Sequence, residues 1–370
     1  RYRSLYLNII IRPLLKSNMG IYITGVGSYI PSHKERNQDF LSHKFLDDSG
    51  KPFGAENTDI IEKFKAITGI EERRYATPNQ TSSDLAFLAA ENAIKDASLD
   101  RETLDYIIVA HNFGDIQYGS IQTDILPSLA TRVKHKLKIK NPNCVAYDLI
   151  FGCPGWVEGV IQAKAFIKSG MAKRCLVIGA DTLSRIADQS DRDAMIFADG
   201  AGATIIEETA EGGGLLSHSS QTYSTEEAFY LYSGKSNDPA TNQEDKYIKM
   251  LGRKVYEFAI SHVPQAIKDC FDKSGEDLNS LKKIFLHQAN EKMDEAIVKR
   301  FYRLFRQPIP ANILPVSIHK LGNSSVATVP TLLDLVKRNE IDGHQINKGD
   351  VALFASVGAG MNINAFTYKF

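Results

Sequence analysis

The sequence contains little cysteine and no excess of either charge. Its 370 residues include four cysteines, none in a Cys-x-x-Cys pair, which argues against a disulfide framework or a structural zinc site and favours a reducing cytoplasm. Lysine plus arginine and aspartate plus glutamate each number 44, so no net field recruits nucleic acid or an anionic membrane. No apolar run is long enough for a transmembrane helix. We therefore expect a cytoplasmic protein without nucleic-acid or membrane partners.

The first 18 residues differ in character from the rest of the chain. The apolar run from Leu5 to Ile11 imitates a signal peptide, but it is broken by Asn8 and no small-residue cleavage site comes after it. Met19 stands immediately before the first convincing strand, residues 21–26. We expect the folded part to start near Met19, with residues 1–18 as an extension or an over-long start assignment.

Strands and helices alternate along the chain, and their order begins again after residue 210. Residues 211–243 shift to Gly, Ser, Thr, Asn and Asp, which marks a boundary. Beyond it, residues 266–286 echo the helix and strand of residues 93–109, and residues 354–360 echo residues 197–202. The pattern predicts an internally duplicated α/β protein with two similar sheets packed through helices. Its halves are residues 19–210 and 211–370.

Cys153 is the first candidate for chemistry. It lies between an apolar strand, residues 144–149, and a helical repeat of apolar residues that ends at Gly170. Pro154 suits the first helical position, and the positive end of a helix dipole favours a thiolate over a thiol. A buried structural cysteine is the alternative, because free cysteines are among the most buried residues. Residue types at this junction leave both interpretations open.

Two polar motifs in the second half supply possible partners. His287 opens His287-Gln288-Ala289-Asn290, directly after the strand at residues 284–286, and Asn323 lies in Gly322-Asn323-Ser324-Ser325, ahead of an apolar helix. The duplication places both at ends of strands, so they can meet the cysteine between the halves. Taken singly, each also fits a structural role, as a satisfied histidine or a turn residue.

These motifs, together with the Gly358-Ala359-Gly360 loop, resemble the β-ketoacyl-acyl carrier protein synthase III (KAS III) family of the thiolase superfamily, over residues 19–370. The resemblance implies a five-layered αβαβα fold, a homodimer, and no cofactor or metal. It implies an acyltransferase of fatty-acid synthesis in which Cys153 takes the acyl group from a thioester. The N–H groups of Cys153 and Ala359 would form the oxyanion hole. His287 and Asn323 would stabilise the enolate formed when malonyl-acyl carrier protein loses carbon dioxide.

The resemblance also implies binding surfaces. Lys292, Lys299 and Arg300 match carrier-protein docking positions, although an ordinary solvated helix face has the same pattern. Arg192 matches a coenzyme A contact. Lys63 and Ile67 replace the tryptophan and arginine that grip the nucleotide in members primed by coenzyme A thioesters, which weakens the case for acetyl-CoA as the primer.

The sequence leaves three alternative functions. The first is a specialised relative that condenses longer or β-ketoacyl chains, as in dialkylresorcinol-type lipid synthesis. The second is a non-catalytic partner subunit, against which the intact Cys153, His287 and Asn323 argue. The third is a dinucleotide oxidoreductase, suggested only by Gly25-Val26-Gly27, which lacks the third glycine of that motif.

Overall fold

The computed structural model describes residues 19–370, so the expected extension at residues 1–18 lies outside the described part of the chain. The main sheet is mixed and nine-stranded, in the order β13-β14-β15-β10-β1-β9-β8-β4-β7. Its strands are β1 (Gly20–Tyr29), β4 (Tyr106–His111), β7 (Val145–Ile150), β8 (Arg174–Thr182), β9 (Asp199–Thr209), β10 (Gly214–Thr222), β13 (Leu281–Leu286), β14 (Val351–Gly358) and β15 (Asn362–Lys369).

This sheet has two parts that repeat one pairing pattern. Strands β7, β4 and β8 run parallel, and β9 and β1 then alternate in direction. In the second part β13 and β14 run parallel, and β15 and β10 alternate in the same way. A single residue pair, Ile21 with Gly214, joins β1 to β10. The two similar sheets expected from the sequence are therefore the two parts of one continuous nine-stranded sheet.

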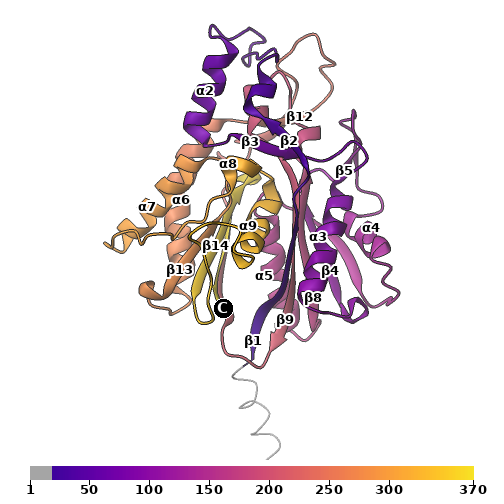
Figure 1. Ribbon diagram of the computed structural model, residues 1–370, viewed down its shortest axis with the longest axis vertical. Coiled ribbons are helices and arrows are strands. Elements are labelled where there is room, and N and C mark those ends of the chain that lie inside the picture. The colour runs from indigo at the N-terminus through magenta and orange to yellow at the C-terminus, as the bar shows by residue number, and fades with distance from the viewer. Residues whose placement is uncertain (1–18) are drawn as a thin grey trace, which may run out of the picture.

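Helices cover both faces of each part, which gives the expected five layers (Figure 1). From right to left in that view, α3 and α4 cover the first part, α5 and α9 lie between the two parts, and α6 and α7 cover the second part. The helices are α2 (Asn57–Thr68), α3 (Ser82–Asp96), α4 (Leu129–Lys136), α5 (Gly155–Lys168), α6 (Gly252–Asp272), α7 (Glu291–Leu304), α8 (Ile318–Leu321) and α9 (Thr328–Lys337).

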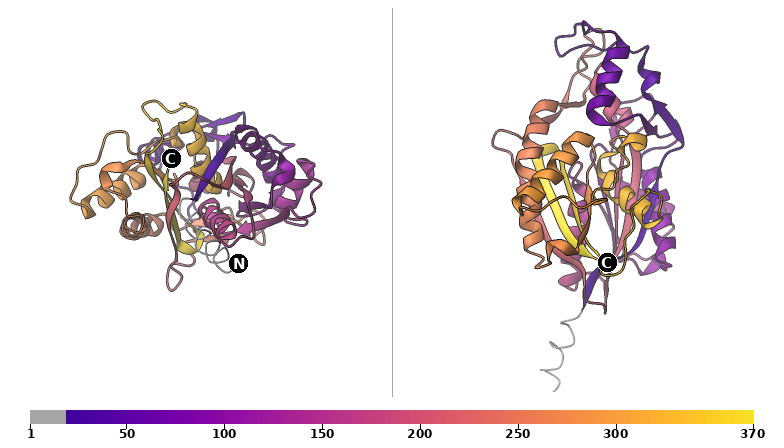
Figure 2. Two further views of the ribbon diagram at one scale, coloured as in Figure 1. Left: turned by 90° about the horizontal axis from the view of Figure 1, so that it is seen from below. Right: turned by 60° about the vertical axis from the view of Figure 1, so that its left-hand side comes forward.

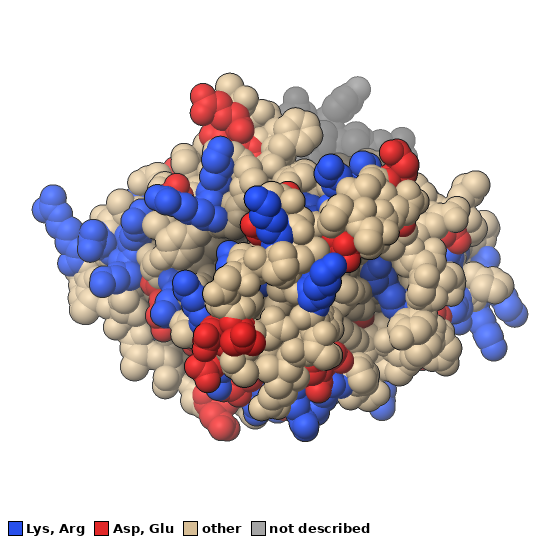
Figure 3. All heavy atoms as spheres, turned by 90° about the horizontal axis from the view of Figure 1, so that it is seen from above, with Lys and Arg blue, Asp and Glu red and all other residues tan. Residues whose placement is uncertain are grey.

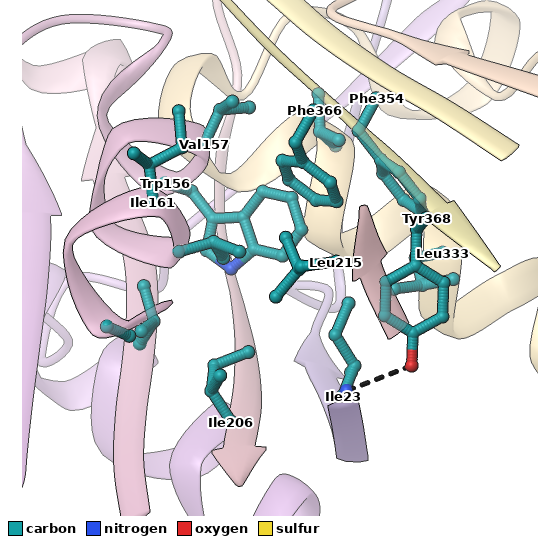
Figure 4. Close-up of a cluster of buried hydrophobic side chains, with 14 of the residues drawn as sticks. Ile23, Trp156, Val157, Ile161, Ile206, Leu215, Leu333, Phe354, Phe366 and Tyr368 are labelled. Carbon is teal, nitrogen blue, oxygen red and sulfur yellow. Dashed lines mark hydrogen bonds between the residues drawn. The ribbon is translucent and has the colours of Figure 1, made fainter. Parts of the chain in front are cut away.

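Aromatic residues join the middle layer to the second part of the sheet (Figure 4). Phe354 of β14 stacks on Phe366 of β15 with ring centroids 4.6 Å apart, and the buried Trp156 of α5 packs on both rings. The Tyr368 hydroxyl accepts a hydrogen bond of 3.0 Å from the backbone N–H of Ile23 in β1. Truncating such a buried aromatic to alanine typically costs about 3–5 kcal/mol. This cluster therefore fixes α5 against the sheet.

The helix starts show where local sequence decides the structure. The polar cluster at residues 81–84 predicts a helix start, and α3 begins there with a capping box in which Asp84 accepts from the N–H of Thr81 at 2.8 Å. The apolar Ile125 and Leu126 predict a helix from residue 125, but α4 begins at Leu129. Pro127 disfavours a helical conformation of the residue before it, and the Ser128 side chain caps the helix.

A smaller unit stands beyond the ends of the sheets, at the top of Figure 1 and of the right-hand view of Figure 2. It contains α2, the paired strands β2 (His33–Arg36) and β3 (Glu72–Tyr75), and a small apolar cluster that includes Phe40, Ile60 and Met195. The other short strands are β5 (Asp115–Ile116), β6 (Thr123–Asp124), β11 (Leu231–Gly234) and β12 (Tyr247–Met250). Within residues 19–370, no helix has both the length and the apolar character needed to cross a membrane.

Candidate active site

Cys153 lies where the sequence predicts, in the turn between β7 and α5. Gly152 has φ +82°, in the left-handed region that glycine adopts without strain. Pro154 is the N-cap of α5 and Gly155 its first residue, so the proline stands one position before the expected one. The turn thus places the thiol directly ahead of the helix N-terminus.

A second turn packs against the cysteine. It joins β14 to β15 through Gly358 and the short 3-10 helix Ala359–Met361. A methyl group at Gly358 would lie 2.9 Å from both the backbone nitrogen and the Cβ of Cys153. The turns that carry Cys153 and Ala359, whose N–H groups are the expected oxyanion donors, are therefore in contact. Only a glycine allows this approach.

The backbone of Asn323 is fixed by two hydrogen bonds to the segment before β9. Its N–H donates to the Ile196 carbonyl at 2.9 Å, and its carbonyl accepts from the Ala198 N–H at 2.8 Å. Its side-chain oxygen accepts from the N–H of Ser325 at 2.8 Å. Because that bond fixes the orientation of the amide, the side-chain nitrogen remains as a donor, and no group of residues 19–370 accepts from it.

His287 comes directly after β13, and its backbone N–H donates to the Ala355 carbonyl of β14 at 2.9 Å. Burial lowers the pKa of His287 to about 4, an effect that the adjoining backbone of Ser325 partly counters. The imidazole is therefore neutral at pH 7, with one nitrogen as donor and the other as acceptor. The next residue, Gln288, is fully buried and accepts from the N–H groups of Ser317 and Ile318. These bonds tie the His287 loop to the segment that leads to Asn323.

Ser325 is where the three candidate residues meet. Its hydroxyl donates to the sulfur of Cys153 at 3.4 Å, its N–H binds the side chain of Asn323, and its backbone adjoins the imidazole of His287. Ser325 belongs to the same motif as Asn323, but the motif alone predicts no role for its hydroxyl. A non-glycine φ of +54° is the only further sign of a special position, and it is visible in the structure alone.

The expected thiolate is not the resting form of Cys153. Burial raises the pKa of this thiol to about 11, the hydrogen bond from Ser325 lowers it, and the carboxylate of Asp181 raises it. Loss of hydration is the largest of these effects, so burial decides the protonation state of the resting thiol. The thiol must lose its proton in a step that the bound substrate or a neighbouring group assists.

The remaining predicted residues lie on the surface. Arg192 is exposed at the start of a 3-10 helix, and its guanidinium lies 5.0 Å from the ring centroid of Phe53. Lys292, Lys299 and Arg300 are exposed on α7. Figure 3 shows Lys and Arg side chains grouped at its left edge, the side on which Figure 1 places α7. None of these cations belongs to the cluster around Ser325.

A cysteine thiol, a neutral histidine and an oriented amide donor, held between two related halves, suit acyl transfer through a thioester followed by carbon–carbon bond formation. The fold and this cluster together define a thiolase-like condensing acyltransferase.

Comparison with known proteins identifies the family. Residues 147–224 match the model for 3-oxoacyl-[acyl-carrier-protein] synthase III, and residues 271–370 match the model for its C-terminal part. The chain is 34% identical to a β-ketoacyl-[acyl-carrier-protein] synthase III of Vibrio vulnificus, covering 94% of this chain and 99% of that protein. It is 32% identical to the Staphylococcus haemolyticus enzyme, with 95% and 99% covered.

A solved structure agrees. The crystal structure of 3-oxoacyl-[acyl-carrier-protein] synthase III from Aquifex aeolicus superposes with a TM-score of 0.78 at 28% identity, covering 95% of this chain and 100% of that chain. The chain belongs to the β-ketoacyl-[acyl-carrier-protein] synthase III family.

Proposed function

We propose that this enzyme condenses an acyl thioester with malonyl-acyl carrier protein, and that Cys153, His287 and Asn323 are its catalytic residues. The observation that carries the proposal is their convergence around Ser325, which bonds to the sulfur and to the amide and whose backbone lies near enough to the imidazole to affect its pKa. The names of the relatives, which are β-ketoacyl-[acyl-carrier-protein] synthases III, supply the reaction class.

In the first half-reaction the Cys153 sulfur attacks the carbonyl carbon of the acyl thioester. A bond from the sulfur to the acyl carbon forms, the donor thiol departs, and the proton lost by Cys153 returns to that departing sulfur. Negative charge develops on the carbonyl oxygen in the transition state. The N–H groups of Cys153 and Ala359 hold this oxygen, which is supported by the contact between their turns.

In the second half-reaction the malonyl thioester loses carbon dioxide and becomes an enolate. Its oxygen needs hydrogen-bond donors, which suits the unoccupied amide nitrogen of Asn323 and the N–H of a neutral His287. The enolate carbon then attacks the acyl carbon on Cys153. The bond between sulfur and acyl carbon breaks, the β-ketoacyl product leaves, and the released Cys153 thiolate takes up a proton from solvent.

The primer is open between two classes. Lys63 and Ile67 are both exposed on α2 and offer neither an aromatic surface nor a guanidinium, while Arg192 has Phe53 beside it as a stacking partner. The first point favours a longer or β-ketoacyl chain delivered by a carrier protein, as in a specialised lipid pathway. The Arg192–Phe53 pair favours the other class, a coenzyme A primer, because a guanidinium and an aromatic ring could both contact the nucleotide.

We further propose the partners and location of the enzyme. The cations of α7 receive the acidic carrier protein, because among residues 19–370 no carboxylate forms an ion pair with Lys292, Lys299 or Arg300. The chain forms a homodimer through β7, an edge strand paired with β4 alone. Its four cysteines are free thiols, which supports a cytoplasmic location.

Intact-protein mass spectrometry tests the reaction. The protein is incubated with a panel of acyl-CoA and acyl-carrier-protein thioesters without extender, and we expect one acyl mass increment that is absent in Cys153→Ala. We expect His287→Ala and Asn323→Ala to acquire the acyl group but to release little carbon dioxide from malonyl-acyl carrier protein. Condensation by Cys153→Ala would refute the mechanism, and the thioester that labels the parent protein identifies the primer class.

A further inference from the structure

A chain of hydrogen bonds reaches the cysteine sulfur from the carboxyl ends of two parallel strands. Asn112 comes directly after β4, and Asp181 lies near the end of β8. The backbone N–H and side-chain nitrogen of Asn112 donate to the two carboxylate oxygens of Asp181, at 2.9 and 2.6 Å. The same side-chain nitrogen donates to the Ser325 hydroxyl at 2.8 Å, and that hydroxyl donates to Cys153 Sγ at 3.4 Å.

Chemistry fixes the direction of the bonds that Asn112 makes in this chain. An ionised carboxylate only accepts hydrogen bonds, so Asp181 turns the nitrogen of the Asn112 amide inward. That nitrogen has two hydrogens, one for Asp181 and one for Ser325. The Ser325 oxygen accepts from Asn112, and its single proton points to the Cys153 sulfur at 3.4 Å. The same hydroxyl is close enough to Asp181 to lower the pKa of that carboxyl. Asp181 and Ser325 are each only 1% exposed, so water does not compete for these positions.

We propose that Asp181 and Asn112 are positioning residues that hold the Ser325 hydroxyl as a hydrogen-bond donor to the Cys153 thiolate. The proposal deepens the proposed function and rests on it, since it takes Cys153 as the nucleophile. A hydrogen bond to an ionised acceptor is about twice as strong as one to a neutral acceptor. The donor therefore stabilises the thiolate more than the thiol, and it assists both the attack on the primer and the departure of the sulfur after condensation.

Neighbouring charges are compatible with this arrangement. Burial raises the pKa of Asp181 to about 6, so the carboxyl is ionised at pH 7 and above. His111 stands beside it on β4, but its ring binds the carboxylate of Asp148 at 3.0 Å. The Asp181 charge by itself opposes a thiolate on Cys153. The neutral amide of Asn112 lies between Asp181 and Ser325 in the chain of bonds. The carboxylate polarises this amide, and the amide in turn polarises the Ser325 hydroxyl.

The test is the pH dependence of Cys153 alkylation by iodoacetamide, with the product measured as intact mass. We expect Ser325→Ala to raise the apparent thiol pKa by about 1 unit, the equivalent of one hydrogen bond to a charged group. Ser325→Gly should give the same shift while relieving the positive φ, which separates loss of the hydroxyl from backbone strain. Asn112→Ala should shift the pKa in the same direction by less.

Ser324→Ala is the matched control. The Ser324 hydroxyl is also buried, but it bonds to Thr328 rather than to the sulfur, so its removal should leave the alkylation profile unchanged. Unfolded variants identify themselves, because the buried Cys144, Cys175 and Cys270 then add further labels.

An unchanged profile in both Ser325 variants, or an equal shift in Ser324→Ala, would overturn the proposal. A shift in the Ser325 variants without one in Asn112→Ala would overturn the positioning role of Asn112 and Asp181. Alkylation needs no thioester, so the two proposals can fail separately. If the variants shift the alkylation profile as expected but the parent protein forms no acyl-enzyme, the proposed function is refuted and the hydrogen-bond proposal is not.

Discussion

At the scale of the residue, Gly358 lies directly against the turn that carries Cys153. An added methyl group would lie 2.7 Å from Pro154 and 2.9 Å from Cys153, shorter than any ordinary contact. We predict that Gly358→Ala displaces the two turns and lowers the acylation rate at least about tenfold, as small misplacements of reacting groups do. Single-turnover acylation measures it. Gly200→Ala is the control, since its methyl would meet nothing closer than 3.5 Å; equal losses in both would contradict the prediction.

The depressed pKa of His287 predicts a pH-dependent stability. Its value is about 4 in the folded protein and about 6.5 in an unfolded chain. As the pH falls from 7, the unfolded state therefore binds the proton first, and the contribution to stability present above pH 6.5 is lost towards pH 4. We expect the parent protein to lose about 2 kcal/mol more than His287→Gln between pH 7 and pH 5.

Urea unfolding at the two pH values gives these free energies. Asp181 and Asp193, with pKa values that burial raises to about 6 and about 7, titrate in the opposite sense. They titrate in both proteins, so the difference isolates His287. Equal losses in parent and variant would mean that the imidazole is not held neutral.

The sequence predicted that Cys153, His287 and Asn323 come together, but not the groups that adjoin them. Each of the three lies in a motif next to a recognisable strand or helix, so residue types and order were sufficient to propose them, and their catalytic roles stay a prediction. The sequence offers one indication that Asn112 and Asp181 belong to the site: each is a polar residue at the carboxyl end of an apolar strand. Their contact with Ser325 depends on residues more than a hundred positions apart packing together, which no local pattern contains.

At the scale of the element, α7 combines a structural and a binding face. Its buried side includes Ile297 and Phe301, while Lys292 and Lys299 point outward. We predict that Lys299→Glu raises the KM for malonyl-acyl carrier protein about three- to tenfold with kcat little changed, because rim charges act on encounter more than on chemistry. The effect should shrink at high salt.

Steady-state kinetics at two ionic strengths measures this effect. Lys282→Glu makes the same charge change at the other end of β13 from His287, again on an exposed lysine, and should leave the KM unchanged. Arg300 is a less suitable probe, because it also donates to the Ile260 carbonyl of α6. An equal rise in KM for Lys282→Glu would assign the effect to net charge instead of to α7.

The elements themselves were predictable to different degrees. The capping box at Thr81 and Asp84 marked the start of α3, since all its partners lie within four residues. The apolar Ile125 and Leu126 predict too early a start for α4, because both side chains are exposed and belong to no buried helical face. The carboxylate of Asp148, which accepts from the N–H of Leu129 at 2.7 Å, caps this helix from β7, and no local pattern reveals that contact.

At the scale of the whole molecule, the repeated strand pairing supports a duplicated origin of the fold, whereas the exact division at residue 211 stays a prediction. The two parts of the sheet are joined by a single residue pair. Helix α5 from the first half and α9 from the second contact both parts. The site lies where the halves meet, so its residues come together only in the complete fold.

The free edge of the sheet leads to the last prediction. Strand β7 pairs with β4 alone, its Val145 and Ile150 are 46% and 62% exposed, and the nearby loop before α4 holds Leu126 at 87%. An apolar, unpaired edge is a template for pairing with another chain, and the proposed homodimer covers it with a second copy. We predict that Ile150→Lys or Leu126→Asp weakens the dimer at least about tenfold, since either change puts a charge into a buried apolar interface.

Light scattering coupled to size exclusion measures the mass across a dilution series. Met171→Lys is the control, because Met171 is equally exposed, at 61%, but lies in the turn after α5 rather than at the β7 edge. A parent protein that is monomeric throughout, or edge variants that dissociate no more readily than Met171→Lys, would exclude β7 as the interface. Dissociation that also lowers acylation would show further that the second copy supports the Cys153 turn, which comes directly after this strand.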